Sequence, residues 1–353
     1  MGTPTADVSL CPNYDLDPTP AIDAYESQHE QLLGTRRFIK TYEGCMEMFP
    51  GVEMFLDQFR NDWYAEKQQE NIYFPWASRQ EWEFASWLLQ SHLSMAAIDS
   101  LLSLEIIKNI PLSFCSAKEL RSCAKTLPPG PLWLCKTLMT KYPTKELPHL
   151  FYCNPIKCLQ ALLSHPHFES HISFIPRRVW TCAAKICHIY NEWLSGDCAW
   201  NMQEVLLPGT TLLGVVLSSD KTNISVMSSN CMAHPLLISL TNINVHIHSK
   251  TSLHAYLLLA LLPIAKFTQK NTHIHSLLQD WLMHQALNIV LSPLKTAASI
   301  GIMMSDPSGN LHYCFMPLAA WITDMPEESL LAGTSMKASP ITTTTAQEFG
   351  DAY

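Results

Sequence analysis

The sequence lacks the segments that direct a chain into a membrane or out of the cell. Its first residues, MGTPTADVSL, contain neither the basic stretch nor the apolar core of a secretory signal. Gly2 does not fit the N-myristoylation pattern, because Ala6 stands where serine or threonine is needed. No apolar run reaches the roughly 18 residues that a membrane-spanning helix requires. We therefore expect no membrane partner.

Paired cysteines are also missing. The chain has 12 cysteines among 353 residues, yet no Cys-x-x-Cys occurs. The nearest pairs, Cys153 with Cys158 and Cys182 with Cys187, are five residues apart, a spacing that does not place two thiolates well on one helical face. These features argue against a disulfide scaffold. Reduced, buried thiols in an intracellular globular protein are expected.

Charge is distributed unevenly along the chain. Residues 1–70 hold thirteen acidic and five basic side chains, a net charge of -8, which is also the formal charge of the whole chain. Residues 108–185 hold eleven basic and three acidic side chains, a net charge of +8. Clustered lysine and arginine neutralise phosphates, so any DNA contact is expected from this middle segment. The first 70 residues read as an acidic, partly flexible segment, and 334–353 as a polar tail.

Residues 71–200 read as a helical region. Capping boxes at Ser78–Glu81 and Ser116–Glu119 each open a predicted helix. The pair of helices around Ser94 also permits a helix-turn-helix interpretation, although its exposed positions include none of the side chains that usually read base edges. A longer helix is expected over 179–194. Basic residues interleaved with aromatics are the candidates for DNA contact: Lys118, Arg121, Lys125, Lys136, Lys141, Lys145, Arg177 and Arg178.

The core of the chain is expected to follow. Residues 212–217 form a short aliphatic run typical of a buried strand, and Asp220 stands where that run ends. An aspartate at this place is ordinarily a turn former or a helix cap. Lys221 beside it is either a surface lysine or a phosphate contact.

A second aspartate makes a site plausible. Apolar runs at 233–240 and 255–264 precede a helical pattern that opens at Asn271 or Thr272, and Pro293 is expected to start a fresh helical turn. Asp306 is expected to form a turn between two strands, and a further run over 311–326 contains Asp324. In the order β-β-β-α-β, a right-handed crossover returns the last strand parallel to the first, which would place Asp220 and Asp324 side by side. Two carboxylates forced together suit a divalent cation, and paired Mg²⁺ ions are commonly used in attack on phosphodiesters.

The sequences of four segments resemble those of a known family. The segments SSDKTNIS (218–225), HPLLISLTNI (234–243), LLLALLPIAKF (257–267) and PLAAWITDMPEESLLAG (317–333) are similar to the transposase of Plavaka elements, fungal DNA transposons related to CACTA elements. The resemblance implies an RNase H-like core with an Asp-Asp-Glu set of metal ligands that cuts and joins DNA in the nucleus, using Mg²⁺ or Mn²⁺. By match to the motifs, Asp220 is the first acid and Asp324 the second.

The chain departs from that pattern at both ends. Relatives typically begin with a zinc finger that has no counterpart before Trp76, and this chain ends 29 residues after Asp324. Glu327 and Glu328 stand too close to the second acid to be the third, and Glu348 lies in the polar tail. We therefore expect a truncated transposase: an α+β chain with an incomplete RNase H-like mixed sheet over 205–333, preceded by the helical region and inactive alone.

Two alternatives remain open. Three His-x-His pairs (at 165, 246 and 273) could bind zinc, although no carboxylate stands at a ligand spacing from them. The chain could also be a non-catalytic module that binds DNA, associates with itself or associates with a complete transposase.

Overall fold

A computed structural model of the chain describes residues 37–50, 57–91, 93–225, 231–269 and 271–335, with isolated positions after 335. Residues 1–36, which make up half of the acidic segment, and Glu348 of the polar tail lie outside the described residues. Helices and mixed sheets both occur, so the predicted α+β class is confirmed. No helix in the described part of the chain is long and apolar enough to cross a membrane.

The helices vary in length from one turn to more than seven. Those that bear on the fold are α2 (Asp57–Arg60), α3 (Ala65–Glu70), α4 (Arg79–Gln90), α5 (Met95–Leu102), α6 (Glu105–Lys108), α7 (Ala117–Ala124), α8 (Pro155–Leu163), α9 (Asp197–Val205), α10 (Val245–His248), α11 (Thr272–Ile300) and α12 (Met325–Ala332).

The strands form one large sheet and three smaller ones. They are β1 (Phe38–Thr41), β2 (Phe49–Pro50), β3 (Trp133–Thr137), β4 (His149–Cys153), β5 (Arg177–Trp180), β6 (His188–Ile189), β7 (Thr211–Leu212), β8 (Val215–Ser219), β9 (Thr222–Ser225), β10 (Cys231–Ala233), β11 (Pro235–Leu240), β12 (Leu257–Leu261), β13 (Ile302–Ser305), β14 (Asn310–Phe315) and β15 (Leu318–Ile322).

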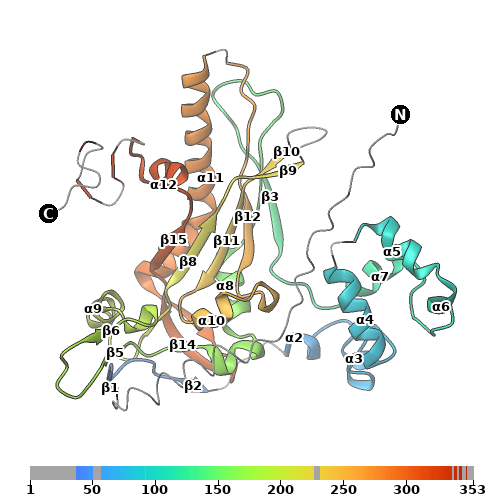
Figure 1. The fold of residues 1–353 in the computed structure, drawn as a ribbon, viewed down its shortest axis with the longest axis horizontal. Coiled ribbons are helices and arrows are strands. Elements are labelled where there is room, and N and C mark those ends of the chain that lie inside the picture. The colour runs from blue at the N-terminus through green and yellow to red at the C-terminus, as the bar shows by residue number, and fades with distance from the viewer. Residues whose placement is uncertain are drawn as a thin grey trace, which may run out of the picture.

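Helices α3 to α7 form a unit on one side of the molecule (Figure 1). Both predicted capping boxes exist in modified form: Ser78 and Ser116 accept hydrogen bonds from the backbone N–H of Glu81 and Glu119. The Glu81 carboxylate accepts from the backbone of Ala77 and from Ser113, so it ties α4 to the segment before α7. The unit buries its own apolar cluster, which includes Trp76, Leu88, Ile98, Phe114 and Leu120.

The large sheet has the strand order β15-β8-β11-β12-β4-β3. Strand β15 lies parallel to β8, and every other neighbouring pair in this sheet is antiparallel. The predicted return of the last strand alongside the first and parallel to it is therefore confirmed. The predicted run over 311–326 is nevertheless divided: β14 belongs to a second sheet, and only β15 joins this one. Apolar side chains of α11, such as Leu282, Ala286 and Val290, share one buried cluster with the sheet residues Leu217, Ile238 and Leu259. In Figure 1, α11 runs along the sheet beside β8 and β15.

The expected helical region 71–200 is helical only in part. Strands β3 and β4 extend the large sheet, and the predicted helix over 179–194 is wrong, because β5 and β6 occupy that stretch. Strand β5 pairs antiparallel with β1, so Val179 lies opposite Ile39. The local pattern of this stretch fits a helical period as well as a strand, and the partner that decides between them, β1, lies 140 residues away in the sequence.

Two further expectations are corrected. The predicted strand over 212–217 is divided at Gly214: β7 pairs with β14 in a second sheet, and β8 joins the large one. A Cβ at Gly214 would lie 2.2 Å from Thr241 Oγ1, so this close approach requires glycine. Pro293 does not begin a new helical turn but lies inside α11, where buried Val290 and Leu294 hold the helix against the core on both sides of it.

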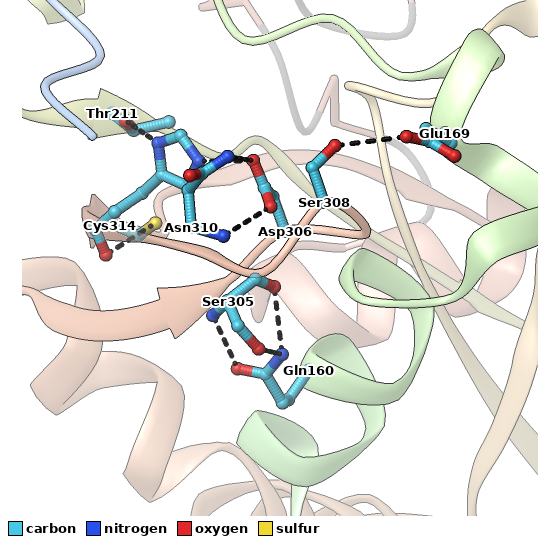
Figure 2. Close-up of polar contacts among 9 residues, drawn as sticks. Gln160, Glu169, Thr211, Ser305, Asp306, Ser308, Asn310 and Cys314 are labelled. Carbon is cyan, nitrogen blue, oxygen red and sulfur yellow. Dashed lines mark hydrogen bonds and ion pairs between the residues drawn. The ribbon is translucent and has the colours of Figure 1, made fainter. Parts of the chain in front are cut away.

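A buried polar network fixes the turn between β13 and β14. Asp306, predicted to form a turn, accepts hydrogen bonds from the backbone and side chain of Asn310 and from His312 Nε2 at 3.0 Å. His312 is fully buried and stacks on Phe174, and its Nδ1 lies 3.5 Å from the Thr211 hydroxyl. Figure 2 shows Asp306 in contact with Asn310, with Thr211 on the far side of Asn310. The network joins the hairpin to β7.

Candidate functional site

The two predicted aspartates lie at the same end of two neighbouring strands. In the parallel pair, Ser218 of β8 is opposite Ile322 of β15, and each aspartate follows its strand residue by two positions. The side chain of Asp220 is exposed and receives a weak hydrogen bond from Thr222 at 3.4 Å. The backbone therefore brings Asp220 and Asp324 to one edge of the sheet, where the strands present their carboxyl ends.

Asp324 is the N-cap of α12. Its Oδ1 accepts a hydrogen bond from the backbone N–H of Glu327 at 3.0 Å, and Pro326 occupies a first-turn position, where a missing N–H costs nothing. The side chain of Asp324 is exposed, so its second carboxylate oxygen is accessible to a ligand. Capping and ligand binding are compatible here, because a carboxylate can accept several hydrogen bonds or coordinate with its second oxygen.

Glu327 is the residue that the sequence interpretation set aside and that the structure places at the centre of this edge. It is 8% exposed, and its Oε1 accepts hydrogen bonds from Ser219 Oγ and, at 3.0 Å, from His234 Nε2. Ser219 Oγ also accepts from Trp321 Nε1 at 2.9 Å. Glu327 thus joins α12 to the strand end that carries Asp220. Its position three residues after an N-cap aspartate is the pattern of a capping box, a signal that could have marked it.

The pKa of Glu327 is lowered. Burial alone would raise it, but the hydrogen bonds from His234 and Ser219, together with the positive charge of nearby Lys221, outweigh burial. Burial raises the pKa of Asp280 on α11, and His284 and Lys221 oppose that shift only in part. Glu327 and Asp280 were not predicted to belong to the site.

A hollow of about 410 Å³ opens beside this edge. Asp324, Glu327 and Asp280 line it together with Lys221 and His234, whereas Asp220 is not among its lining residues. A second hollow of about 660 Å³, lined by Lys145, Lys266, His149 and Phe151, shares His234, Ile264 and Ala265 with the first. The two hollows therefore adjoin each other, and together they are called the groove here: Lys145 and Lys266 lie at its basic end, and Asp280, Asp324 and Glu327 at its acidic end.

The donor set is suited to a hard cation. Carboxylate oxygens are the ligands that Mg²⁺ and Mn²⁺ prefer, and Asp220 and Asp324 carry such oxygens at two neighbouring strand ends. Within the described residues, no three or more histidine, cysteine or acidic side chains are gathered closely enough to hold an ion. Of the His-x-His pairs, His246 and His248 lie on α10, and His248 Nε2 is 2.9 Å from Ser239 Oγ.

The predicted DNA-contact residues fall in three separate places. Lys118, Arg121 and Lys125 belong to α7 or its C-cap, in the helical unit. Arg178 stacks over the Trp200 ring at 4.5 Å and lies 3.4 Å from an Asp197 oxygen, so it serves the packing of the small β1-β5-β6 sheet. The third place is the large sheet and the segments beside it, where Lys145 and Lys221 line the groove, Lys141 lines a separate hollow and Lys136 lies on β3.

The segment that carries Lys145 is fixed by pairing with a segment the sequence interpretation did not single out. The backbone N–H of Lys145 donates to the Lys266 carbonyl at 2.9 Å, and Thr144 forms an isolated bridge with Phe267. Lys266 thereby joins Lys141 and Lys145 in one basic group, which is defined here as the lysine rim. Sequence distance concealed it, because the two segments are more than 100 residues apart.

The fold and this edge define an α+β protein with two aspartates at the carboxyl ends of neighbouring parallel strands, next to a groove with one basic end. Residues 114–353, which are 240 of the 353, match a family model described as Plavaka transposase. The chain therefore belongs to the Plavaka transposase family, and the resemblance found in the sequence is confirmed. Comparison with curated proteins and with solved structures found no match for the chain. Family membership indicates a transposase whose partner is DNA.

Proposed function

We propose that the groove holds a DNA strand and that its acidic end is the metal-dependent centre for DNA cleavage and strand transfer at transposon ends. The observation that carries this proposal is the parallel β8–β15 pair, which brings Asp220 and Asp324 to one sheet edge beside the hollow. Asp220 and Asp324 would hold Mg²⁺ or Mn²⁺. Such an ion, when bound, stabilises charge on a phosphoryl group and lowers the pKa of the attacking water.

The remaining residues would position the strand. Lysines of the rim would pair with phosphates at the basic end, and Lys221 would do so beside Asp324. Glu327 would keep the edge in place through Ser219 and His234. We further propose little or no catalysis by the chain alone, in a nuclear protein that acts by self-association or together with a complete transposase.

Metal binding is tested by thermal unfolding with and without Mn²⁺. At a concentration of ten times its dissociation constant, a ligand adds about 1.4 kcal/mol to the folded state. We expect this gain in the parent chain and its loss in Asp220→Ala and in Asp324→Ser. Serine is chosen at 324 because it preserves the N-cap of α12, which alanine would remove at a cost of about 1 kcal/mol.

The matched control is Asp62→Ala, which removes a half-buried carboxylate between α2 and α3 that accepts a hydrogen bond from Gln68 Nε2 at 2.9 Å and does not line the groove. This variant should respond to Mn²⁺ as the parent does. An equal response of all four proteins would contradict the proposed ligands.

A non-catalytic DNA-binding module is the second candidate, because the basic groove end does not require the aspartates. Replacing Lys136, Lys141 and Lys145 together with alanine should weaken DNA binding and flatten its dependence on salt, by about 0.9 in log–log slope for each phosphate that is no longer neutralised. Fluorescence anisotropy at several salt concentrations measures both quantities. The control replaces Lys118, Arg121 and Lys125 of the helical unit; a larger loss there would move the DNA interface to α7.

A further inference from the structure

A third hollow lies on another face of α11 and is not part of the groove. It has a volume of about 410 Å³, and its lining is mainly apolar: Tyr142 and Phe267 on one side, and Leu277, Leu278 and Trp281 of α11 on the other. Trp281 is 50% exposed and Tyr142 39% exposed, so two aromatic side chains are only partly covered by the protein. In Figure 1 the N-terminal half of α11 lies close to the long connection between β3 and β4 that carries Tyr142.

The walls of this hollow are fixed by the fold. Phe267 is 5% exposed, and its ring meets His275 edge-on at a centroid distance of 5.8 Å. The bridge between Thr144 and Phe267, together with the hydrogen bond from the Thr268 N–H to the Pro143 carbonyl at 3.0 Å, holds the Tyr142 segment against it. A hollow held in this way is preorganised, which lowers the entropic cost of filling it.

Charge around the hollow is positive. Lys141 contributes to its lining. Lys145 and Lys266 of the lysine rim lie on the same two paired segments as Tyr142 and Phe267 but line the adjoining groove, as does Glu146, the acidic residue of that stretch. An apolar hollow with aromatic faces and amines at its border suits a flat, apolar group that is attached to phosphates. Nucleic-acid bases stack on aromatic side chains irrespective of their identity, while lysines pair with the backbone.

We propose that this hollow binds an unpaired base of the DNA, stacked on Trp281, while the lysine rim pairs with the adjacent phosphates. The proposal depends on the proposed function only in taking DNA as the partner. It does not require the metal centre, because the hollow shares no lining residue with the acidic end of the groove. A strand that crosses the lysine rim from Lys145 to Lys141 would pass from the groove to this hollow.

The test compares a single-stranded oligonucleotide with an abasic strand of equal length, which keeps the phosphates and lacks the bases. Binding is measured by fluorescence anisotropy with EDTA present, so that metal has no part in the result. The parent should bind the base-bearing strand roughly tenfold more tightly than Trp281→Ala does. With the abasic strand the two proteins should bind alike, and the salt dependence should be the same for both, because the substitution leaves every lysine–phosphate pair in place.

Two further variants keep the test decisive. Trp281→Leu keeps an apolar side chain at this position, which preserves packing, and should show the same loss of binding. Trp87→Ala removes a 57% exposed tryptophan from α4 and should bind as the parent does. Equal binding of the base-bearing strand by the parent and Trp281→Ala would overturn the proposal and leave the hollow to a protein segment. Equal losses in Trp281→Ala and Trp87→Ala would overturn it too. A base-dependent loss combined with no Mn²⁺ response would refute the metal centre and leave this inference standing.

Discussion

Replacing Glu327 with alanine is expected to lower the free energy of unfolding by about 3 kcal/mol, because a buried donor that loses its acceptor costs on the order of 1–3 kcal/mol and Glu327 is the acceptor of two. The carboxylate is buried, and its loss would leave Ser219 and His234 without their acceptor at the end of β8. Leaving buried donors unpaired costs more than the hydrogen bonds contribute when present. Urea unfolding measures the change, and Glu328→Ala, at the next position of the same helix, should differ from the parent by less than about 0.5 kcal/mol.

The effect of Glu327 depends on pH in a direction set by its lowered pKa. A carboxyl group whose pKa is lower in the folded than in the unfolded chain stabilises the fold above the unfolded value, which is about 4.3 for glutamate. That contribution is lost as the pH falls through the folded value. The stability difference between parent and Glu327→Ala should therefore be constant from about pH 6 to 7 and shrink below about pH 4. A difference that grows toward acid pH would show that Glu327 is protonated in the folded chain.

Replacing Asp306 with alanine should be as damaging, at about 3 kcal/mol, although the residue lies in a turn. Its carboxylate accepts from Asn310 and His312, and His312 is fully buried. The pKa of Asp306 is lowered: burial raises it, but these hydrogen bonds and the His312 ring outweigh burial. Alanine would leave the imidazole N–H without its acceptor and release the β13–β14 turn.

The controls for Asp306 come from the same turn. Ser308→Ala removes an exposed hydroxyl that donates to Glu169 at 3.1 Å, a surface contact shown in Figure 2, and should cost less than about 1 kcal/mol. Asp306→Asn keeps the size and one acceptor oxygen, so its loss should fall between the two. If Asp306→Ala were no worse than Ser308→Ala, the residue would be a simple turn former, as its sequence context predicts.

The central strands could be predicted because each is a short aliphatic run with its own boundary, and α11 because its apolar residues recur along one face. The order of these elements was then enough to predict the parallel return of β15 beside β8. Strands β5 and β6 could not be predicted, since the edge of β1 that selects extended structure at Val179 comes from the N-terminal part of the chain. The local sequence pattern contains no information about such a distant partner.

The same dependence on distant partners explains why Asp220 and Asp324 could be predicted and the residues around them could not. Asp220 and Asp324 follow strands and are visible as strand ends, whereas Asp280 and Lys266 reach the groove only through tertiary packing. Glu327 was rejected for its closeness to Asp324 in sequence. Because α12 starts at the end of β15, Glu327 contacts Ser219 of the neighbouring strand β8. It therefore does not occupy the same position as Asp324.

The parallel pairing of β8 with β15 also has a consequence for how the chain folds. Ser219 and Glu327 are 108 residues apart, and β11, β12, α11 and the β13–β14 hairpin lie between them. Contacts of such separation form slowly, because a long loop must close before any of its energy is recovered. Strand β11, the antiparallel neighbour of β8, and β12 beside it can assemble earlier from nearby sequence. The acidic edge is therefore expected to be completed among the last steps of folding, so that affinity for Mn²⁺ would appear during refolding later than most of the secondary structure.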